Sequence, residues 1–431
     1  MTAEIAIMNK NAIALAIDSA VTMSGSSNQK IFTSANKLFA LSKYHPIGIM
    51  IYGNAIFMKV PWETIIKIYR NNLRKKKFNT LNEYANNFIA FLNNGNPLFP
   101  NSIQEEYLYT SIHSYFNFIK NKIKKKIEIK HAKDGIITDE IIEQIVSEEI
   151  EEHYKNWDKA KNISSIPKTF NENIIKKYKK TTEEIIEKVF EKLPISKNHL
   201  NKLQKISRSL FSKFPENIQN EAISGIVIAG FGEKEAFPSL KSFHIEGIVI
   251  NQLKFKELIS VKIDFNRNAS IIPFAQSEMV STFMEGVDPF YKNFEESYIT
   301  RIFSKYTEMI VDNIKRNIDK KNELKEKLSS ISNKIIKAYI KKMEDTRREK
   351  YISPITSVVS MLPKDELAAM AESLVNLTSF KRKVTLVRET VAGPVDVAVI
   401  SKGDGFVWIK RKHYFKAELN PQFFANYYKE V

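Results

Sequence analysis

A threonine stands directly behind the initiator methionine in the opening stretch MTAEIAIMN, and its position suggests a specific chemistry. A threonine hydroxyl is a poor nucleophile until a base accepts its proton, and a free α-amine on the same residue can be that base. An α-amine has a reference pKa of about 7.7–8.0, close to the operating pH that general-base catalysis favours. Thr2 carries such an amine only if Met1 is removed. Because threonine is small enough for methionine aminopeptidase to act, we expect this removal to occur without any propeptide.

Other catalytic chemistries have less support in the sequence. Cysteine is absent, which excludes disulfides, thiolate metal sites and a cysteine nucleophile. The histidines are scattered, and the stretch EEIEEHYKNW lacks the two-histidine helical spacing of a zinc protease, so we expect no metal centre. No phosphate-binding stretch of the form GxxxxGKS or GxxxxGKT occurs, so the chain is not expected to hydrolyse ATP itself. We therefore expect no cofactor.

The composition predicts a folded chain, and the cytoplasm is the expected compartment. Hydrophobic residues make up 43% of the 431 residues, which is enough for a substantial core. No apolar run approaches the length of a membrane span, and no basic region precedes a hydrophobic stretch at the N-terminus. The net charge of +17 could attract nucleic acid. The basic residues are interleaved with acidic ones, however, so we expect neither nucleic-acid binding nor membrane association.

Two kinds of sequence pattern alternate along the chain. Short apolar or β-branched runs predict strands within 3–53 and 224–267, and VDVAVIS and GFVWIKRK predict two closing strands joined by the turn KGDG. Apolar residues spaced by three and four predict helices from residue 57 to about 220 and again over 291–350. The stretch from Gln276 to Glu285 predicts the first turns of a helix, and KDELAAMAESLVNLTSF predicts another.

The order of these elements predicts a layered α+β fold, with sheets stacked, helices outside and two helical insertions. The expected parts are a core segment at 1–76, a helical insertion at 77–220, a second core segment at 221–290, a charged helical insertion at 291–350 and a closing core segment at 351–431.

The first core segment resembles the start of a proteasome β subunit and of the bacterial proteasome-related peptidases, which are N-terminal-nucleophile hydrolases. The resemblance lies in Thr2, the strands AEIAIMN and AIALAIDS, the segment SANKLFALS and the strand end IYGNA. Asp18 follows Thr2 by sixteen residues, Lys37 lies in SANKLFAL and Gly53 in MIYGNA, as the family pattern requires. The later stretches SGIVIAGFGEKEAFPSLKSFHIEG, PFAQSEMVSTFMEG and RETVAGPVDVAVISKGDGFVWI also resemble the family.

This resemblance implies a four-layer αββα sandwich and a role for each matching residue. Lys37 would sit beside the Thr2 hydroxyl and lower the pKa values of the hydroxyl and the amine, and Asp18 would pair with Lys37. The backbone amide of Gly53 would stabilise the oxyanion, where one donor contributes about 2.7–4 kcal/mol. Taken singly, each residue has a simpler explanation: a common Met-Thr start, a turn or cap aspartate, a surface lysine and a turn glycine.

The resemblance also implies partners and reveals departures. Peptide or protein substrates, a homo-oligomeric ring and an unfoldase partner are expected. The stretch between Asp18 and Lys37 is a few residues longer than the family pattern, so we expect its loop to bulge. In the closing segment Glu389 stands where the family has aspartate, and Ala392 stands where it has serine. Ser277 is expected as a further neighbour of the site, although the loop that contains it matches the family pattern imperfectly.

Three hypotheses follow. The first is a threonine-type peptidase or amidohydrolase that forms an acyl-enzyme on Thr2. The second is a catalytically weak or inactive proteasome-like scaffold that acts through its helical insertions, which the departure at Ala392 favours. A third, nucleic-acid binding through the basic insertions, rests on charge alone and predicts an affinity that falls steeply with salt.

Overall fold

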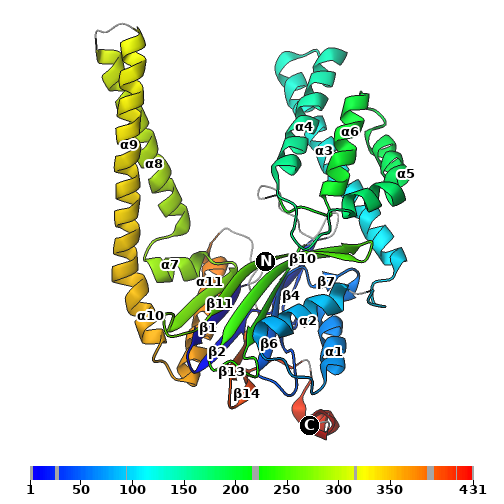
Figure 1. The fold of residues 1–431 in the computed structure, drawn as a ribbon, viewed down its shortest axis with the longest axis vertical. Helices are drawn as coiled ribbons and strands as arrows, with labels where there is room; N and C mark the ends of the chain where they lie inside the picture. The colour runs from blue at the N-terminus through cyan, green and yellow to red at the C-terminus, as the bar shows by residue number, and fades with distance from the viewer. Residues whose placement is uncertain are drawn as a thin grey trace. The chain divides into compact units, whose positions relative to one another are not determined.

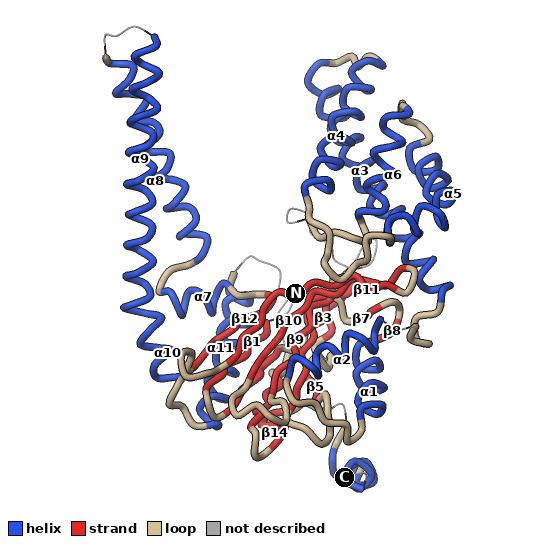
Figure 2. Tube along the Cα trace, viewed as in Figure 1, coloured by secondary structure: helices blue, strands red, loops and turns tan. Residues whose placement is uncertain are grey.

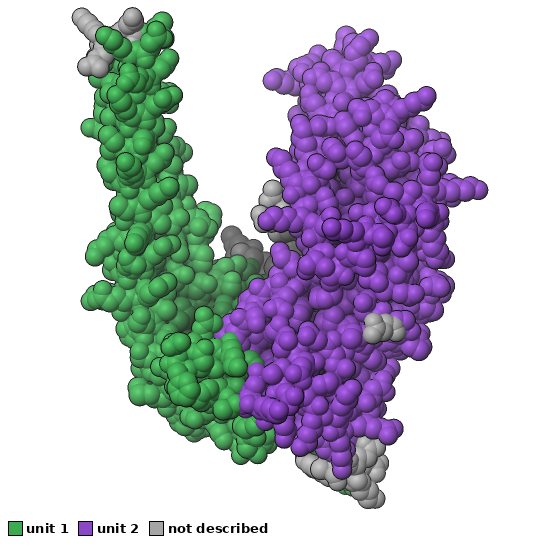
Figure 3. All heavy atoms as spheres, in the orientation of Figure 1, with its two compact units in different colours: residues 1–38, 236–239, 262–431 green, residues 39–235, 240–261 purple. Residues whose placement is uncertain are grey.

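The computed structural model describes residues 3–24, 29–93, 95–215, 223–314, 318–385, 393–413 and 415–429. The chain has a mixed α+β fold with antiparallel sheets. It divides into two compact units, which Figure 3 distinguishes by colour. The first unit comprises residues 1–38, 236–239 and 262–431, and the second comprises residues 39–235 and 240–261.

The first unit is organised around a five-stranded sheet, shown in red among the helices of Figure 2. Its strand order is β12 (Ala269–Ala275), β1 (Ala3–Asn9), β2 (Ala12–Ile17), β13 (Asp396–Ser401) and β14 (Gly405–Lys410). Every neighbouring pair is antiparallel. Strands from the two ends of the sequence therefore lie side by side, and the closing segment of the chain completes the sheet that its opening segment begins.

Helix α11 (Lys364–Val384) covers one face of this sheet. Its apolar residues recur at three- and four-residue spacing, and Leu367, Ala371 and Leu374 pack against alternate residues of β1 such as Ile5 and Ile7. Side chains on the opposite face of β1 are buried as well, because all seven residues of the strand are inaccessible. Strands buried on both faces read as continuous apolar runs, which explains the sequence of β1.

The remaining helices of the first unit follow β12. They are α7 (Glu278–Glu285), α8 (Pro289–Asn313), α9 (Ile318–Arg347), a π-helical turn at Arg348–Ile352, α10 (Ser353–Val359) and the C-terminal α12 (Pro421–Lys429), together with a 3₁₀ turn at Ala417–Leu419. Helices α8 and α9 form the long hairpin labelled in Figure 1. Thr307 and Val311 of α8 and Ile336 of α9 are its buried residues.

The second unit contains most of a second antiparallel sheet, in the order β11 (Gln252–Lys262), β10 (Ser239–Val249), β9 (Ser224–Gly230), β6 (Ile47–Gly53) and β5 (Leu38–Ala40). Two short strands, β7 (Ile56–Phe57) and β8 (Val60–Pro61), pair before α1 (Trp62–Leu73) and α2 (Leu81–Asn93). One apolar core joins these two helices to the sheet through residues such as Ile66, Phe88 and Ile226.

Four further helices of the second unit share a separate apolar core. They are α3 (Asn101–Asp134), α4 (Asp139–Lys159), α5 (Phe170–Phe190) and α6 (Lys197–Ser209). A buried ion pair ties this block to the sheet, because Lys254 of β11 contacts Glu246 of β10 and also donates to the carbonyl of Leu210 at 2.6 Å. Helix α2, which the sequence placed inside the first insertion, packs instead with the sheet.

Two elements differ from the sequence expectations. The extra residues between Asp18 and Lys37, expected to bulge as a loop, include a hairpin of β3 (Val21–Ser24) and β4 (Gln29–Phe32). Strand β12 lies beyond the range 224–267 in which the sequence predicts strands, and it contains Pro273. Proline is tolerated on an edge strand, which is the position that β12 occupies.

Candidate active site

Asp18 and Lys37 form a buried ion pair in the first unit. The Lys37 Nζ atom donates to Asp18 Oδ1 at 3.2 Å, and the two side chains are 6% and 1% exposed. Asp18 is the first residue after β2, and Lys37 is the last residue before β5. The structure therefore brings together two side chains that the sequence separates by the β3–β4 hairpin.

The Asp18 carboxylate also holds the beginning of β1. The amide of Ala3 donates to Asp18 Oδ1 at 3.0 Å, and the amide of Asp18 donates to the carbonyl of Ala3 at 3.2 Å. The amide of Ala20 donates to Asp18 Oδ2 at 3.0 Å. These bonds fix the carboxylate, because hydrogen bonds to an ionised acceptor are the stronger kind. They join the Asp18–Lys37 pair to the residue that follows Thr2 in the chain.

Burial changes the proton affinities of both members of the pair. It raises the pKa of the Asp18 carboxyl above its ordinary value, although Lys37 and the amides of Ala20 and Ala3 act in the opposite direction. It lowers the pKa of the Lys37 ammonium, although Asp18 and Glu4 act in the opposite direction. A lysine with a lowered pKa can take part in proton transfer more readily than a lysine in water.

A second carboxyl, that of Glu4, belongs to the same cluster. Glu4 is 2% exposed, and both its carboxyl oxygens lack a hydrogen-bond partner among the described residues. Burial raises the pKa of Glu4 well above its ordinary value, with Lys37 opposing this effect and Asp18 adding to it. The sequence analysis did not select Glu4. The signal was available, because a charged residue interrupts an otherwise apolar strand.

A second buried ion pair lies on the same face of the sheet. Glu4 and Asp396 both stand opposite Ile17 of β2 in the strand register, which puts their backbones about 10 Å apart with one strand between them. Lys412 forms an ion pair with Asp396, and the Lys412 amide donates to Asp396 Oδ1 at 2.9 Å. The positive charge of Lys412 contributes to the lowered pKa of Lys37.

Ser19, next to Asp18, connects the site to the closing segment of the chain. The buried Ser19 hydroxyl donates to the carbonyl of Pro394. Gly393, just before it, has a φ of 85°, and a Cβ atom there would lie 2.6 Å from the carbonyl oxygen of Thr33. A side chain at this position would therefore clash with backbone, which accounts for glycine in the stretch VAGPV.

Ser277 lies in a segment that begins beside the start of β1. Ala275, the last residue of β12, pairs with Ala3 and has a φ of 58°, an uncommon conformation for a residue other than glycine. Ser277 follows two residues later as the N-cap of α7, is half-buried, and makes no side-chain capping bond. Its participation in the site stays a prediction.

Gly53 is the last residue of β6 and belongs to the second unit. Its φ is 76°, and a Cβ atom would lie 2.5 Å from the carbonyl oxygen of Ile223. The backbone conformation and this close approach are sufficient to require glycine. The role of its amide as an oxyanion donor stays a prediction.

Three residues named in the sequence analysis lie outside the described residues: Thr2, Glu389 and Ala392. Their roles stay predictions. Of the residues expected at the site, the structure brings Asp18 and Lys37 into contact and adds Glu4 to them.

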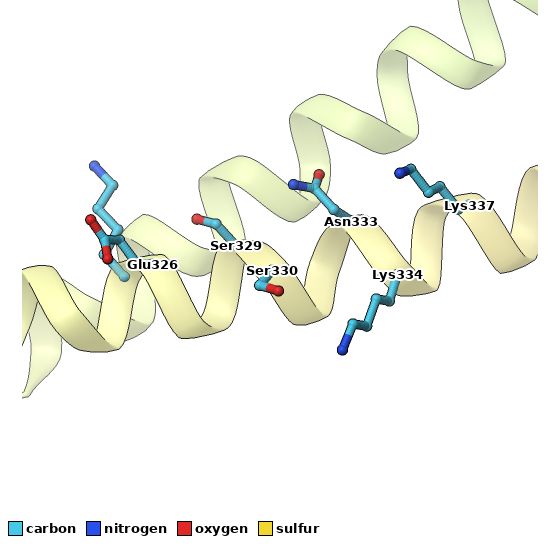
Figure 4. A pocket seen from close by; sticks show the side chains of 7 residues that line it. Glu326, Ser329, Ser330, Asn333, Lys334 and Lys337 are labelled. Atoms are coloured by element: carbon cyan, nitrogen blue, oxygen red, sulfur yellow. The ribbon is translucent and has the colours of Figure 1, made fainter.

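The depression on α9 does not offer a convincing site. It has a volume of about 640 Å³, and all its lining residues belong to that one helix. Figure 4 shows Asn333 and Lys334 projecting from different sides of α9, so the polar groups do not converge. Among the described residues, no cluster of three or more histidine, aspartate or glutamate side chains could hold a metal ion. No described helix combines the length and apolar character needed to cross a membrane.

Comparisons of the sequence with other proteins give no assignment. No protein-family model matches the chain, and no curated protein matches it.

Proposed function

We propose that this chain is an N-terminal threonine amidohydrolase of the proteasome-like type, acting on amide bonds of peptides or proteins. The observation that carries the proposal is the buried Asp18–Lys37 pair, which is hydrogen-bonded through Asp18 to the amide of Ala3. Ala3 is the residue next to Thr2. A buried lysine ammonium beside a threonine nucleophile would favour ionisation of the hydroxyl.

In the proposed reaction, the Thr2 Oγ atom attacks the carbonyl carbon of the amide while the Thr2 α-amine accepts the hydroxyl proton. The C–N bond then breaks, the α-amine returns the proton to the leaving amine, and an ester-linked acyl-enzyme forms. Water hydrolyses the ester with the α-amine acting again as base. Lys37 stabilises the developing negative charge, Asp18 keeps Lys37 in place, and the Gly53 amide serves as oxyanion donor.

The proposal includes the finer architecture and the assembly. Strands β1, β2, β9 and β13 are buried along their whole length, a pattern typical of the inner layers of an αββα sandwich. A cytoplasmic homo-oligomeric ring fed by an unfoldase would suit a peptidase of this type. The helices α3–α6 and the α8–α9 hairpin would then lie outside the catalytic core.

A second candidate function is a proteasome-like scaffold that binds partners through its helices. It is favoured by large apolar residues of α8 that are exposed to solvent. These are Phe290, Tyr291, Phe294, Tyr298, Ile302, Tyr306 and Met309, each between 46% and 80% exposed. Exposed apolar surface of this size often marks an interaction site.

The deciding experiment is the intact mass of the purified chain before and after incubation with a peptide epoxyketone. This probe forms a stable adduct only with a residue that carries both a hydroxyl and a free α-amine. We expect a mass that lacks Met1 and a gain of one probe mass. The gain should disappear in Thr2→Ala and persist in Thr2→Ser, while Thr300→Ala at an exposed position of α8 should react as the wild type does.

The outcomes separate the two functions. Retention of Met1 contradicts the enzymatic proposal and favours the scaffold. Loss of Met1 without an adduct, in a protein that shows the wild-type fold by circular dichroism, also contradicts it. An adduct that survives in Thr2→Ala would place the nucleophile elsewhere.

A further inference from the structure

Among the described residues around Lys37, the buried charges do not balance. Three carboxyl groups, those of Glu4, Asp18 and Asp396, lie close to two ammonium groups, those of Lys37 and Lys412. Asp18 is paired with Lys37, and Asp396 is paired with Lys412. This arrangement leaves Glu4 with no ion-pair or hydrogen-bond partner among the described residues.

An ionised and unpartnered carboxylate would be very costly at this position. Glu4 is 2% exposed, and its strand neighbours in the register are the apolar Ile17 and Phe274. Removing an ionised carboxylate from water costs several kcal/mol, so such a group takes up a proton instead. A protonated Glu4 leaves two carboxylates for the two ammonium groups, so these five described groups together carry no net charge.

The location of Glu4 makes this proton relevant to the candidate site. Glu4 follows Ala3, the residue whose amide is bonded to Asp18, and its carboxyl interacts electrostatically with both Asp18 and Lys37. Alternate side chains of β1 face opposite sides, and Ala3 and Ile5 pack on the side of α11. Glu4 therefore projects from the other face, which also carries Asp396.

We propose that Glu4 is a positioning residue that stays a neutral carboxylic acid while the site is active, and that its ionisation switches the site off. The proposal rests on the proposed function of Thr2. An ionised Glu4 would compete with Asp18 for the Lys37 ammonium. It would also add a negative charge near the Thr2 α-amine, and a neighbouring negative charge favours the protonated form of an amine, which cannot act as a base.

The proton on Glu4 can be detected without any measurement of activity. Glu4→Gln is a neutral isostere that cannot ionise. Because the pKa of Glu4 is raised in the folded state, the stabilising contribution of its proton is complete below about pH 4.5 and is lost as the pH rises towards the folded-state value. Urea unfolding from pH 4 to pH 9 should therefore show the wild type losing stability relative to Glu4→Gln. The exposed Glu128→Gln variant should follow the wild type.

Parallel stability curves for the wild type and Glu4→Gln would overturn the proposal. If Glu4→Gln does not fold, infrared spectroscopy of the wild type decides the question. The carbonyl stretch of a protonated carboxylic acid at pH 7 supports the proposal, and its absence overturns it.

The link to the site is tested by the rate of epoxyketone modification as a function of pH. The wild-type rate should rise as the α-amine loses its proton and then fall about tenfold for each pH unit above the pKa of Glu4. The Glu4→Gln rate should rise without the fall. A wild-type rate that never falls, or one that falls identically in Glu4→Gln, overturns the switch. If neither protein is modified at any pH, the proposed function and this switch both fail, whereas the stability and infrared measurements still establish whether Glu4 carries a proton.

Discussion

The Lys37 ammonium lies 3.2 Å from the Asp18 carboxylate, with 6% and 1% of the two side chains exposed. Two charges removed from water attract each other strongly, but each has also lost its hydration. Such a pair contributes little net stability compared with apolar residues of the same size. The presence of this ion pair at the start of β1 is therefore better explained by a role in the candidate site than by a contribution to stability. The pair also provides the most direct test of the site.

Breaking the Asp18–Lys37 pair on one side should be costly. Asp18→Asn and Lys37→Met each leave one buried charge without its partner, so we expect a loss of about 3–5 kcal/mol in the free energy of unfolding. The double variant should recover part of that loss, since no charge is then left unpaired. Urea unfolding of the three variants measures this coupling.

The exposed i,i+4 pair Glu63–Lys67 supplies the control, with side chains 36% and 54% exposed. Glu63→Gln and Lys67→Met should each change stability by less than about 1 kcal/mol. If the losses of unfolding free energy in Asp18→Asn and Lys37→Met simply added in the double variant, this would contradict the coupling of the two side chains as a buried ion pair.

Gly53→Ala should destabilise the second unit. The added Cβ atom would lie 2.5 Å from the Ile223 carbonyl oxygen, and the residue would have to keep a φ of 76°. Backbone strain of this kind costs about 1–3 kcal/mol, measurable as a lower midpoint in urea unfolding. Gly403→Ala is the matched control, because a Cβ atom there meets no atom within 4 Å. Equal effects of the two substitutions would show that the close approach at Gly53 does not matter.

Ser19→Ala should cost stability because it removes a partly buried hydrogen bond. The Ser19 hydroxyl donates to the carbonyl of Pro394, which would be left without this donor. We expect a loss of about 0.5–1.5 kcal/mol and slower epoxyketone modification, since Ser19 adjoins Asp18. Ser242→Ala provides the comparison: Ser242 is equally buried, but its hydroxyl has no hydrogen-bond partner among the described residues. If Ser242→Ala lowered the free energy of unfolding as much as Ser19→Ala does, the effect of Ser19→Ala would be due to lost packing and not to the lost hydrogen bond.

The helical block of the second unit should lose stability in mild acid. Both ring nitrogens of His153 make hydrogen bonds. Nδ1 lies 2.7 Å from the Tyr115 hydroxyl, and Nε2 lies 3.1 Å from Glu149 Oε1. Burial, and then the charge of Lys122, lowers the pKa of His153. The neutral ring therefore contributes stability that is present above about pH 6.5 and lost as the pH falls through the lower folded-state value.

Thermal unfolding between pH 7.5 and pH 5 measures this loss. His153→Gln should be less stable than the wild type at pH 7.5 and should show a flatter dependence on pH. His131→Gln, at an exposed position near the end of α3, should behave as the wild type does. If the dependence of the unfolding temperature on pH is the same in His153→Gln as in the wild type, groups other than His153 cause the sensitivity to acid.

The sequence predicted several strands well. The bounds of β1, β6 and β10 coincide with the runs AEIAIMN, IGIMIYG and SLKSFHIEGIV. It failed for β12, which lies beyond the predicted strand range and contains Pro273, a residue that sheets tolerate at an edge. It also failed for the β3–β4 hairpin, whose short polar strands carry no apolar periodicity. Edge position and pairing are tertiary properties that local patterns do not contain.

The candidate site was predictable only in part. The resemblance implied the pairing of Asp18 with Lys37, and the structure brings these side chains together. Glu4 was missed because it is not one of the residues that carry the resemblance, although it is the one charged residue in the run AEIAIMN. Its significance depends on the number of charges around it, which strands from both ends of the chain determine.

Pro273 has a consequence for the behaviour of the protein at high concentration. An edge strand offers unpaired amides that can recruit a strand from another molecule, which is the first step of sheet-type aggregation. Strand β12 is such an edge, with isoleucines at positions 271 and 272 directly before the proline. Because proline has no amide hydrogen, it removes one of the donors that a foreign strand would need. Pro273 thus helps to keep the sheet from growing beyond its own chain.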